Sequence, residues 1–252
     1  MTAGLVTKGI ILAAGRGSRM GGLTSEKPKS LFEVDGKPLI ETQIEAMALN
    51  NITNVGIVTG YKCELLNGYG SVKFFNERWH ETQMVSSLEC ASNWLADSNF
   101  IISYSDIFYE KEAVKLLLNQ EVEIAITYDA NWLVNWSERF DNPCEDAESF
   151  SLSSDGFLSD IGRKNVSLEQ INGQFMGLLY VSVSGWSKLK KLRRANTPEK
   201  NRKQDMTNLL QQAVVSGNFK IKAVPYFGKW GELDTPSDLS LYASKKGFSS
   251  VR

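Results

Sequence analysis

The sequence has few cysteines, one histidine and no long uninterrupted apolar run. Its three cysteines, Cys63, Cys90 and Cys144, are odd in number and far apart. We therefore expect reduced thiols rather than a disulfide framework or a paired-cysteine metal site. No stretch approaches the roughly 18 apolar residues of a membrane-spanning helix, and the apolar run at 9–15 is too short for a signal peptide. These absences favour a cytoplasmic protein with no membrane partner.

Neither sign of charge is in excess. The 28 Lys and Arg residues nearly balance the 29 Asp and Glu residues, for a net charge of -1, so no overall field attracts nucleic acid or anionic lipid. Any attraction for phosphate must be local, and nucleic acid is not expected as a partner. A length of 252 residues suits one large domain over 1–252, as a monomer or homodimer.

The segment 9–31, GIILAAGRGSRMGGLTSEKPKSL, joins an apolar run to a glycine-rich, cationic loop. The run at 10–12 is typical of a strand buried on both faces. Gly15 and Gly17 let the backbone turn tightly and bring N–H groups up to phosphate oxygens, where a Cβ would obstruct them. The cations around the turn are Arg16, Arg19, Lys27 and Lys29. The loop predicts a polyphosphate ligand, with an ordinary strand-to-loop turn as the alternative.

Two better-known glycine loops do not fit this segment. A dinucleotide-binding loop requires a third glycine where Met20 stands. A Walker loop requires Lys followed by Ser or Thr directly after its last glycine, whereas Leu23 and Thr24 follow Gly22 here. The loop therefore belongs to neither class.

Hydrophobic periodicity predicts strands that alternate with helices, and so a mostly parallel α/β sheet. The predicted strands cover 10–12, 55–58, 72–75, 100–104, 122–127, 175–183 and 219–224. The predicted helices cover 38–48, 85–95, 112–118, 184–194, 205–215 and 236–243. The pattern weakens over 131–168, which predicts loops and short antiparallel strands. The segment 193–205, RRANTPEKNRKQD, reads as a charged, solvated connection.

Several motifs together resemble one enzyme family. They are AAGRGSRM, EKPKSL and KPLIETQIEAM near the N-terminus, then RWHETQMVSSL, SYSDIFY, GQFMGLLYVS and WGELDTPSDL further along. In order and approximate spacing they are similar to the sugar-phosphate and cytidylyl nucleotidyltransferases. MVSSL and ELDTPSDL resemble the phosphocholine-type cytidylyltransferase branch more than the glucose-1-phosphate enzymes. The resemblance implies a single Rossmann-like three-layer α/β sandwich of the glycosyltransferase-A type.

Two aspartates are candidates for a metal site. Asp106 follows the strand predicted at 100–104, and Asp234 precedes the closing helix, so both could reach the carboxyl edge of a parallel sheet. Two carboxylates with open coordination positions suit Mg²⁺, and the resemblance maps the family's metal-binding aspartates onto these positions. Ser105 stands where the family often has glycine. The alternative is a turn residue at Asp106 and a helix cap at Asp234.

Two cations are candidates for catalysis. Lys29 follows Pro28 in a restrained segment, so its ammonium loses little freedom when it neutralises the reacting phosphates. Arg19 is expected to grip the β- and γ-phosphates, because a guanidinium binds two oxygens at once. His80 is not needed as a base, since a phosphate monoester is already ionised near neutral pH.

The predicted nucleotide-binding residues lie in three segments that could flank a base and its phosphates. They are Leu12, Ala13, Ala14, Gly15, Arg16, Gly17 and Ser18, then Gly60 and Tyr61, then Gln83, Ser86 and Ser87. Serine hydroxyls and backbone groups can pair with the amino group and carbonyl of cytosine.

The acceptor is expected to bind a lobe formed by 131–182 and 219–234. Trp132 and Trp136 are four residues apart and would share a helix face. With nearby carboxylates they could surround an ammonium group, although tryptophans that simply cover the sheet edge are an equal alternative. Arg163 and Lys164 are candidates to meet the carboxylate or phosphate of a phosphorylated amino acid.

The resemblance implies transfer of CMP from CTP to a small phosphate or phosphonate, with release of pyrophosphate and Mg²⁺ as cofactor. Candidate acceptors are phosphocholine, phosphoethanolamine, aminoethylphosphonate and a phospho-amino acid, and the product would serve as a precursor of cell-surface polysaccharide or lipid. One alternative is a sugar-1-phosphate nucleotidyltransferase using UTP, dTTP or GTP. The other is a nucleotide-sensing module without turnover.

Overall fold

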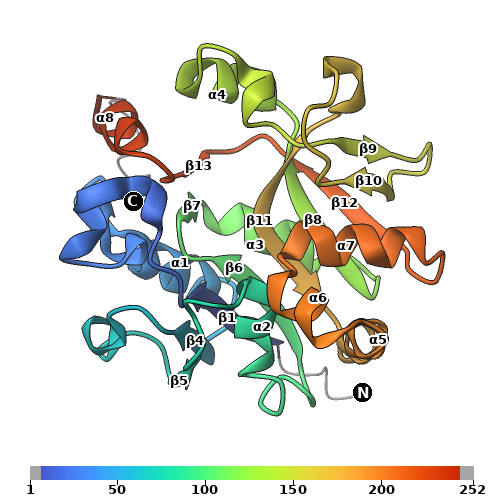
Figure 1. The fold of residues 1–252 in the computed structure, drawn as a ribbon, viewed down its shortest axis with the longest axis horizontal. Helices are drawn as coiled ribbons and strands as arrows, with labels where there is room; N and C mark the ends of the chain where they lie inside the picture. Colours follow the sequence, from blue (N-terminus) through green and yellow to red (C-terminus); the bar gives the residue numbers. More distant parts are fainter. Residues whose placement is uncertain (1–6, 245–252) are drawn as a thin grey trace.

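Strands and helices alternate along most of the chain (Figure 1), of which this computed structural model describes residues 7–244. The strands are β1 (Thr7–Ala13), β2 (Glu33–Val34), β3 (Lys37–Pro38), β4 (Val55–Thr59), β5 (Val72–Phe75), β6 (Asn99–Tyr104), β7 (Ile107–Tyr109), β8 (Ile124–Asp129), β9 (Phe150–Leu152), β10 (Leu158–Ile161), β11 (Gln174–Val181), β12 (Ile221–Tyr226) and β13 (Trp230–Glu232). The α-helices are α1 (Leu39–Ala48), α2 (Met84–Glu89), α3 (Lys111–Leu118), α4 (Trp132–Arg139), α5 (Val183–Arg194), α6 (Pro198–Lys203), α7 (Met206–Val215) and α8 (Pro236–Ser244). Among residues 7–244, no helix is both long and apolar enough to cross a lipid bilayer.

Seven of the strands form one sheet in the order β12-β8-β11-β6-β1-β4-β5. β1 pairs in parallel with β4 and β6, β4 with β5, and β12 with β8. β11 runs antiparallel to both of its neighbours, β6 and β8. The prediction of a mostly parallel central sheet is therefore confirmed.

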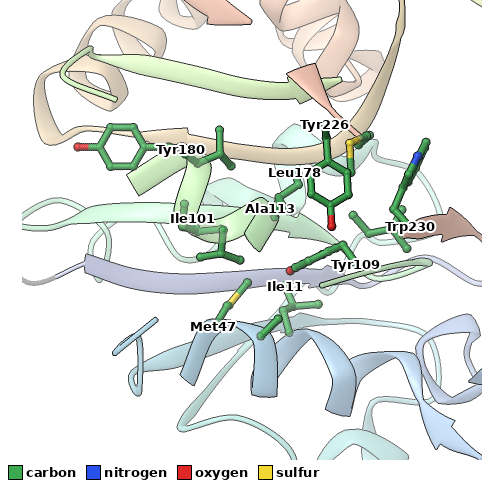
Figure 2. Close-up of a cluster of buried hydrophobic side chains, with 14 of the residues drawn as sticks. Ile11, Met47, Ile101, Tyr109, Ala113, Leu178, Tyr180, Tyr226 and Trp230 are labelled. Carbon is green, nitrogen blue, oxygen red and sulfur yellow. The ribbon is translucent and has the colours of Figure 1, made fainter. Parts of the chain in front are cut away.

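Helices cover both faces of this sheet. The side chains of each strand alternate between the two faces and so contribute to two cores. In β1, Ile11 and Ala13 belong to the core shared with α1 and α3, and Figure 2 shows Ile11 there beside Met47. Ile10 and Leu12 belong to the opposite core, shared with α2, α5 and α7. The predicted three-layer sandwich is confirmed.

The central strands end together at one edge of the sheet. Ala13 of β1 is opposite Thr59 of β4, and Leu12 is opposite Tyr104 of β6. The loops that begin after these residues carry most of the predicted nucleotide-binding residues. Ligands of open α/β sheets bind at this carboxyl edge, so the strand register itself places the candidate site.

Three segments differ from the sequence predictions. The helix predicted over 85–95 ends at Glu89, and turns follow it. Within 131–168 lie the predicted antiparallel strands, β9 and β10, and the helix α4, which supplies the helix face considered for Trp132 and Trp136 in a segment otherwise predicted as loops. The interpretation of 193–205 as a solvated connection is wrong for Arg193, which is buried and paired with Glu89, and the segment contains α6.

Candidate active site

A two-stranded ladder beside the main sheet brings distant carboxylates together. β7 pairs with β13 antiparallel, which puts Glu232 opposite Ile107, and the Leu233 N–H donates to the Asp106 carbonyl at 2.8 Å. Asp234 follows directly and precedes α8. Asp106, Glu232 and Asp234 can each direct one carboxylate oxygen to within 4.8 Å of the others. The ladder therefore builds a three-carboxylate cluster.

Lys29 lies against this cluster. It follows Pro28, whose backbone is extended, and begins a short 3-10 turn (Lys29–Leu31). Its side chain is buried, and its Nζ is 2.5 Å from Asp234 Oδ1 and 3.3 Å from Asp106 Oδ2. The ammonium thus bridges the two predicted metal ligands, as expected of a cation that serves the same reaction centre.

Gly17 makes room for the stem of Lys29. Its backbone has a φ of +70°, and an added Cβ would lie 2.5 Å from the Cε and Cγ atoms of Lys29. A Cβ at Gly15 would meet nothing within 4 Å. The sequence interpretation gave both glycines the same task, but of the two only Gly17 is sterically constrained by neighbouring protein atoms.

Arg19 reaches the cluster from the solvent side. Its guanidinium pairs with the second carboxylate oxygen of Asp234, while most of its own side chain is exposed. The next residue, Met20, is fully buried with Phe108 and Leu233, which anchors the loop. Arg19 therefore projects from a fixed point at the mouth of the site, where it could meet a polyphosphate.

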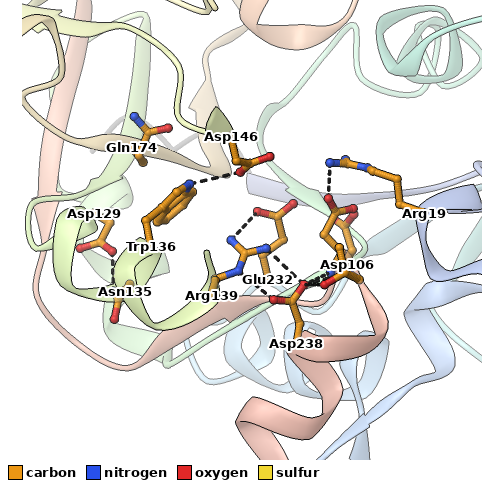
Figure 3. A network of polar contacts seen from close by, with 12 residues as sticks. Arg19, Asp106, Asp129, Asn135, Trp136, Arg139, Asp146, Gln174, Glu232 and Asp238 are labelled. Atoms are coloured by element: carbon orange, nitrogen blue, oxygen red, sulfur yellow. Dashed lines mark hydrogen bonds and ion pairs between the residues drawn. The ribbon is translucent and has the colours of Figure 1, made fainter. Parts of the chain in front are cut away.

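A buried arginine of α4 supports the other side of the cluster (Figure 3). Arg139 donates to both oxygens of Asp238, at 2.9 and 3.2 Å, and its Nη1 is 3.6 Å from Glu232 Oε2. Asp238 also accepts the backbone N–H groups of Asp234 and Thr235, each at 2.8 Å. Arg139 therefore orients Glu232 directly and the Asp234 turn through Asp238.

The electrostatics of the cluster suit a cation. Burial alone lowers the pKa of Lys29, but Asp106 and Asp234 outweigh it and raise the pKa, so the ammonium stays charged. Burial, together with Asp106, raises the pKa of Glu232 to about 7 although Arg139 opposes the shift. Three carboxylates whose oxygens can come within 4.8 Å of one another could hold a hard divalent ion through oxygen ligands.

The predicted nucleotide-binding segments lie around the carboxyl edge. The Tyr61 N–H donates to the Ala14 carbonyl at 2.9 Å, and the Arg16 guanidinium is 5.7 Å from the Tyr61 ring centroid. α2 packs its Val85 side chain into the core that contains Leu12 and Ala14. The structure thus gathers the segments 12–18, 60–61 and 83–87. The binding roles of these residues stay predictions.

The serines predicted to contact the base already have partners. The Ser86 hydroxyl donates to the Asn201 carbonyl at 3.1 Å, and the Ser87 hydroxyl accepts from Asn76 at 2.9 Å. The side chain of Gln83 is exposed, and among residues 7–244 no hydrogen bond to its amide is observed. Gln83 therefore offers the free polar side chain of this segment.

The predicted acceptor residues occupy two places. Trp132 and Trp136 share one face of α4 with ring centroids 6.3 Å apart, but both are buried, and their N–H groups donate to the Ile171 carbonyl and to Asp146. One face of Trp136 lies 5.1 Å from the Arg139 guanidinium. The cation near this ring is thus the protein's own arginine.

Arg163 and Lys164 lie outside the tryptophan cluster and are engaged in ion pairs. Arg163 donates three hydrogen bonds to the two carboxylate oxygens of Asp160, and Lys164 contacts Glu148 at 3.2 Å. The side chains of Arg163 and Lys164 are each about half exposed. Their part in acceptor binding, like that of the tryptophans, stays a prediction.

Comparison with known proteins places this site in a family. The model of the MobA-like NTP transferase domain matches residues 9–203. The chain belongs to this family. A CTP:phosphoglutamine cytidylyltransferase of Campylobacter jejuni is 34% identical over 252 residues, which cover 94% of this chain and 99% of that protein. A choline-phosphate cytidylyltransferase of Streptococcus pneumoniae is 37% identical over 105 residues, 40% of this chain and 46% of that protein.

A solved structure shares the fold. The inositol-1-phosphate CTP transferase of T. maritima superposes with a TM-score of 0.74 at 20% identity, covering 96% of this chain and 97% of that one. The resemblance to nucleotidyltransferases, and among them to the phosphocholine-type cytidylyltransferases, is confirmed by these matches. This chain therefore carries a nucleotidyltransferase domain of the MobA-like family.

Two members of the site were missed from the sequence. Glu232 lies in the motif WGELD, but nothing in local periodicity separates it from a surface glutamate. Arg139 sits in a polar, acidic stretch that predicted loops. Its partner Asp238, on the helix that follows Asp234, gave no signal either, because the burial of this ion pair appears only in the folded protein.

Proposed function

We propose that this protein transfers CMP from CTP to the phosphate or phosphonate of a small acceptor and releases pyrophosphate. The observation that carries the proposal is the convergence of Lys29 with Asp106 and Asp234 beneath a glycine-rich loop, at the carboxyl edge of the sheet. The cytidylyltransferase relative that matches almost the whole chain supports CTP as the donor.

The side chains suit an in-line displacement. An oxygen of the acceptor phosphate attacks the α-phosphorus of CTP, and the bond to the bridging α–β oxygen breaks as pyrophosphate leaves. Lys29 stabilises the charge that gathers on the α-phosphoryl oxygens, and Arg19 holds the β- and γ-phosphates. The reaction requires positioning and charge stabilisation, with no covalent enzyme intermediate.

Mg²⁺ is the proposed cofactor. Asp106 and Asp234 would hold it, with Glu232 beside them, because carboxylate oxygens are the ligands this ion prefers. When bound, the ion neutralises negative charge on the reacting phosphates. The Lys29 ammonium contacts both of these aspartates. We propose that Lys29 exchanges these contacts for substrate phosphate when metal and nucleotide bind.

The acceptor is proposed to be a small phosphate or phosphonate that bears an amino or amide group. The near full-length match is to an enzyme named for phosphoglutamine, whereas the match to the choline-phosphate enzyme covers less than half of this chain. A phosphorylated amino acid amide therefore comes first, before phosphocholine, phosphoethanolamine and aminoethylphosphonate. The product, CDP-linked from a phosphate acceptor or CMP-linked from a phosphonate, would supply cell-surface polysaccharide or lipid synthesis from the cytoplasm.

A substrate panel tests this proposal. Pyrophosphate release would be measured for CTP, UTP, dTTP and GTP, each with phosphoglutamine, the three amine-bearing acceptors and glucose 1-phosphate, in the presence of Mg²⁺. We expect turnover with CTP and a phospho-amino-acid or amine acceptor. Equal or faster turnover with glucose 1-phosphate and another nucleotide would establish the sugar-phosphate alternative. Nucleotide binding without pyrophosphate release from any pair would establish the sensing module.

A further inference from the structure

A second buried arginine lies outside the carboxylate cluster. Arg193, near the end of α5, is 2% exposed. Its Nε and Nη2 donate to the two carboxylate oxygens of Glu89, both at 2.8 Å, and its Nη1 donates to Gln204 Oε1 at 2.8 Å. This guanidinium therefore joins α5 to the end of α2, the helix that carries predicted nucleotide-binding residues.

The segment 196–204, which contains α6, completes the junction and is called the α6 strap below. The Asn201 carbonyl accepts from the Ser86 hydroxyl at 3.1 Å and from Arg193 at 3.4 Å. The Arg202 carbonyl accepts the Gln83 N–H at 2.9 Å. Both ends of the 83–89 segment are thus fastened, one by the strap backbone and the other by Arg193.

Neutral amides fix the strap itself. Asn196 exchanges hydrogen bonds with Gln212 of α7 at 3.1 and 2.9 Å, and Gln204 donates to the same Gln212 at 2.8 Å. The Asn201 amide donates to the Arg193 carbonyl at 3.0 Å. These contacts hold the strap against α5 and α7, while the Asn201 and Arg202 carbonyls accept hydrogen bonds from the 83–89 segment. A network with its members paired in this way specifies one arrangement of the elements that it joins.

The opposite face of α2 packs on the sheet, next to the glycine-rich loop. Val85 and Leu88 lie in the core that contains Leu12 and Ala14, the residues that lead into the glycine-rich loop. α2 is therefore held between the sheet and the Arg193 network. The Gln83 backbone is fixed while its amide remains exposed. A side chain on a fixed backbone loses less entropy when it binds a ligand.

We propose that Arg193 is a positioning residue for nucleotide recognition, which acts through Glu89 and the α6 strap to hold the Gln83–Ser87 segment against the base. The inference rests on the proposed function, because it takes CTP as the donor. A buried ion pair often adds little net stability, since desolvation offsets the attraction. The Arg193 network accordingly fixes the position of α2 more than it adds to the stability of the fold.

Steady-state kinetics of Arg193→Gln test the inference, with Arg194→Gln as the matched control on the exposed neighbour. We expect the KM for CTP to rise about tenfold in Arg193→Gln. The KM for the acceptor and the kcat at saturating CTP should stay within about twofold, and Arg194→Gln should match the wild type. Arg193→Lys, which keeps the charge but loses the two-pronged contact, should lie between the two.

A second pair of variants connects the effect to Gln83. Gln83→Ala should raise the KM for CTP by itself, and Arg193→Gln should then add little, because both changes remove the same contact. If Arg193→Gln does not fold, Asn196→Ala replaces it, since that change loosens the strap from Gln212 without touching a predicted nucleotide-binding residue and should raise the same KM by a smaller factor.

Three results would overturn the inference: an unchanged KM for CTP, an equal rise in both KM values, or full additivity with Gln83→Ala. Each would show that the network serves only the fold. A wild-type enzyme that turns over a different nucleotide, but not CTP, would overturn the proposed function. The wild-type measurement therefore separates the two failures.

Discussion

Gly17 meets two requirements at once, a left-handed backbone and space for the stem of Lys29. Alanine at this position would adopt φ +70° at a cost of about 1 to 2 kcal/mol. It would also place a Cβ 2.5 Å from Lys29 Cε and Cγ. We expect Gly17→Ala to lower kcat at least about tenfold by displacing Lys29, a barrier increase of about 1.4 kcal/mol.

Gly15→Ala is the matched control for that prediction. The added methyl group meets nothing within 4 Å, so the unfolding free energy should change by less than about 0.5 kcal/mol. Thermal unfolding and pyrophosphate release would be measured for both variants. Equal loss of activity in the two would show that the glycines act through the bound nucleotide and not through Lys29.

Substitution of Lys29 and substitution of Arg19 should change different quantities, the kcat in the first case and the affinity for CTP in the second. Lys29→Ala is expected to lower kcat by about a hundredfold while CTP still binds, because the charge acts most strongly in the transition state. Arg19→Ala should mainly raise the dissociation constant of CTP, since its exposed guanidinium can add phosphate contacts. Calorimetric titration with CTP and single-turnover kinetics separate the two effects. The reverse pattern would exchange the roles.

At the level of single residues, the sequence predicted the site residues that lie in recognisable motifs. It did not predict the buried arginines that support them. Lys29, Asp106 and Asp234 were predicted and lie together. Arg139 and Arg193 were not, because a buried arginine has the same local sequence signature as a solvated one. Each arginine pairs with a carboxylate on another helix, Arg139 with Asp238 and Arg193 with Glu89. No local sequence pattern reports such a pairing.

Among the elements, α4 and α8 depend on one buried ion pair. The side chains of Arg139 and Asp238 are each 2% exposed. Arg139→Gln would leave the carboxylate of Asp238 without its cation, so the unfolding free energy should fall by about 3 kcal/mol. The double variant Arg139→Gln with Asp238→Asn should recover part of this loss, because Asp238 then no longer carries a buried charge that needs a cation. Chemical denaturation measures both, and an unaltered single variant would contradict the account.

Asp160 of β10 accepts the Gln211 amide of α7 at 3.0 Å, and this contact should depend on pH. Burial raises the pKa of Asp160, but the hydrogen bonds from Arg163 and Ser149 outweigh it, so its folded-state pKa lies below the usual value. Such a carboxylate contributes stability above an unfolded pKa of about 3.9 and loses it as pH falls through the folded pKa. Because Arg163 is half exposed, the contribution should be below about 1 kcal/mol.

Asp160→Asn tests this pH dependence. The variant should show a smaller fall in unfolding free energy than the wild type as pH drops below about 4, since it has no proton to gain at this position. At neutral pH it should be slightly less stable than the wild type. Parallel pH dependences for the two proteins would show that the Asp160 contact adds nothing to stability.

The main-sheet strands were predictable, whereas the ladder of β7 and β13 was not. A strand buried on both faces is a short apolar run, and β1, β4 and β6 each have one. β7 and β13 are three residues each, and their partners lie far apart in the chain. No period of two develops over such a length, so Glu232 could not be placed beside Asp106 in advance.

Across the whole molecule, the topology explains how one site draws on both ends of the chain. β1, β4 and β6 run parallel and deliver their loops to one edge, while β11 reverses direction and carries the chain toward α5 and α7. The return through β12 and β13 then brings Asp234 to Lys29. The alternation of strands and helices predicted the sheet, but it did not specify this return.

The most direct test of the account is the kcat for pyrophosphate release from CTP, with Mg²⁺ and the preferred acceptor, in Asp106→Asn and Asp234→Asn. Each change removes a carboxylate charge from the cluster and keeps the side-chain shape. The account predicts a fall in kcat of about a hundredfold or more in each variant, with thermal unfolding temperatures close to that of the wild type. Near-wild-type Mg²⁺-dependent rates in both variants would contradict it.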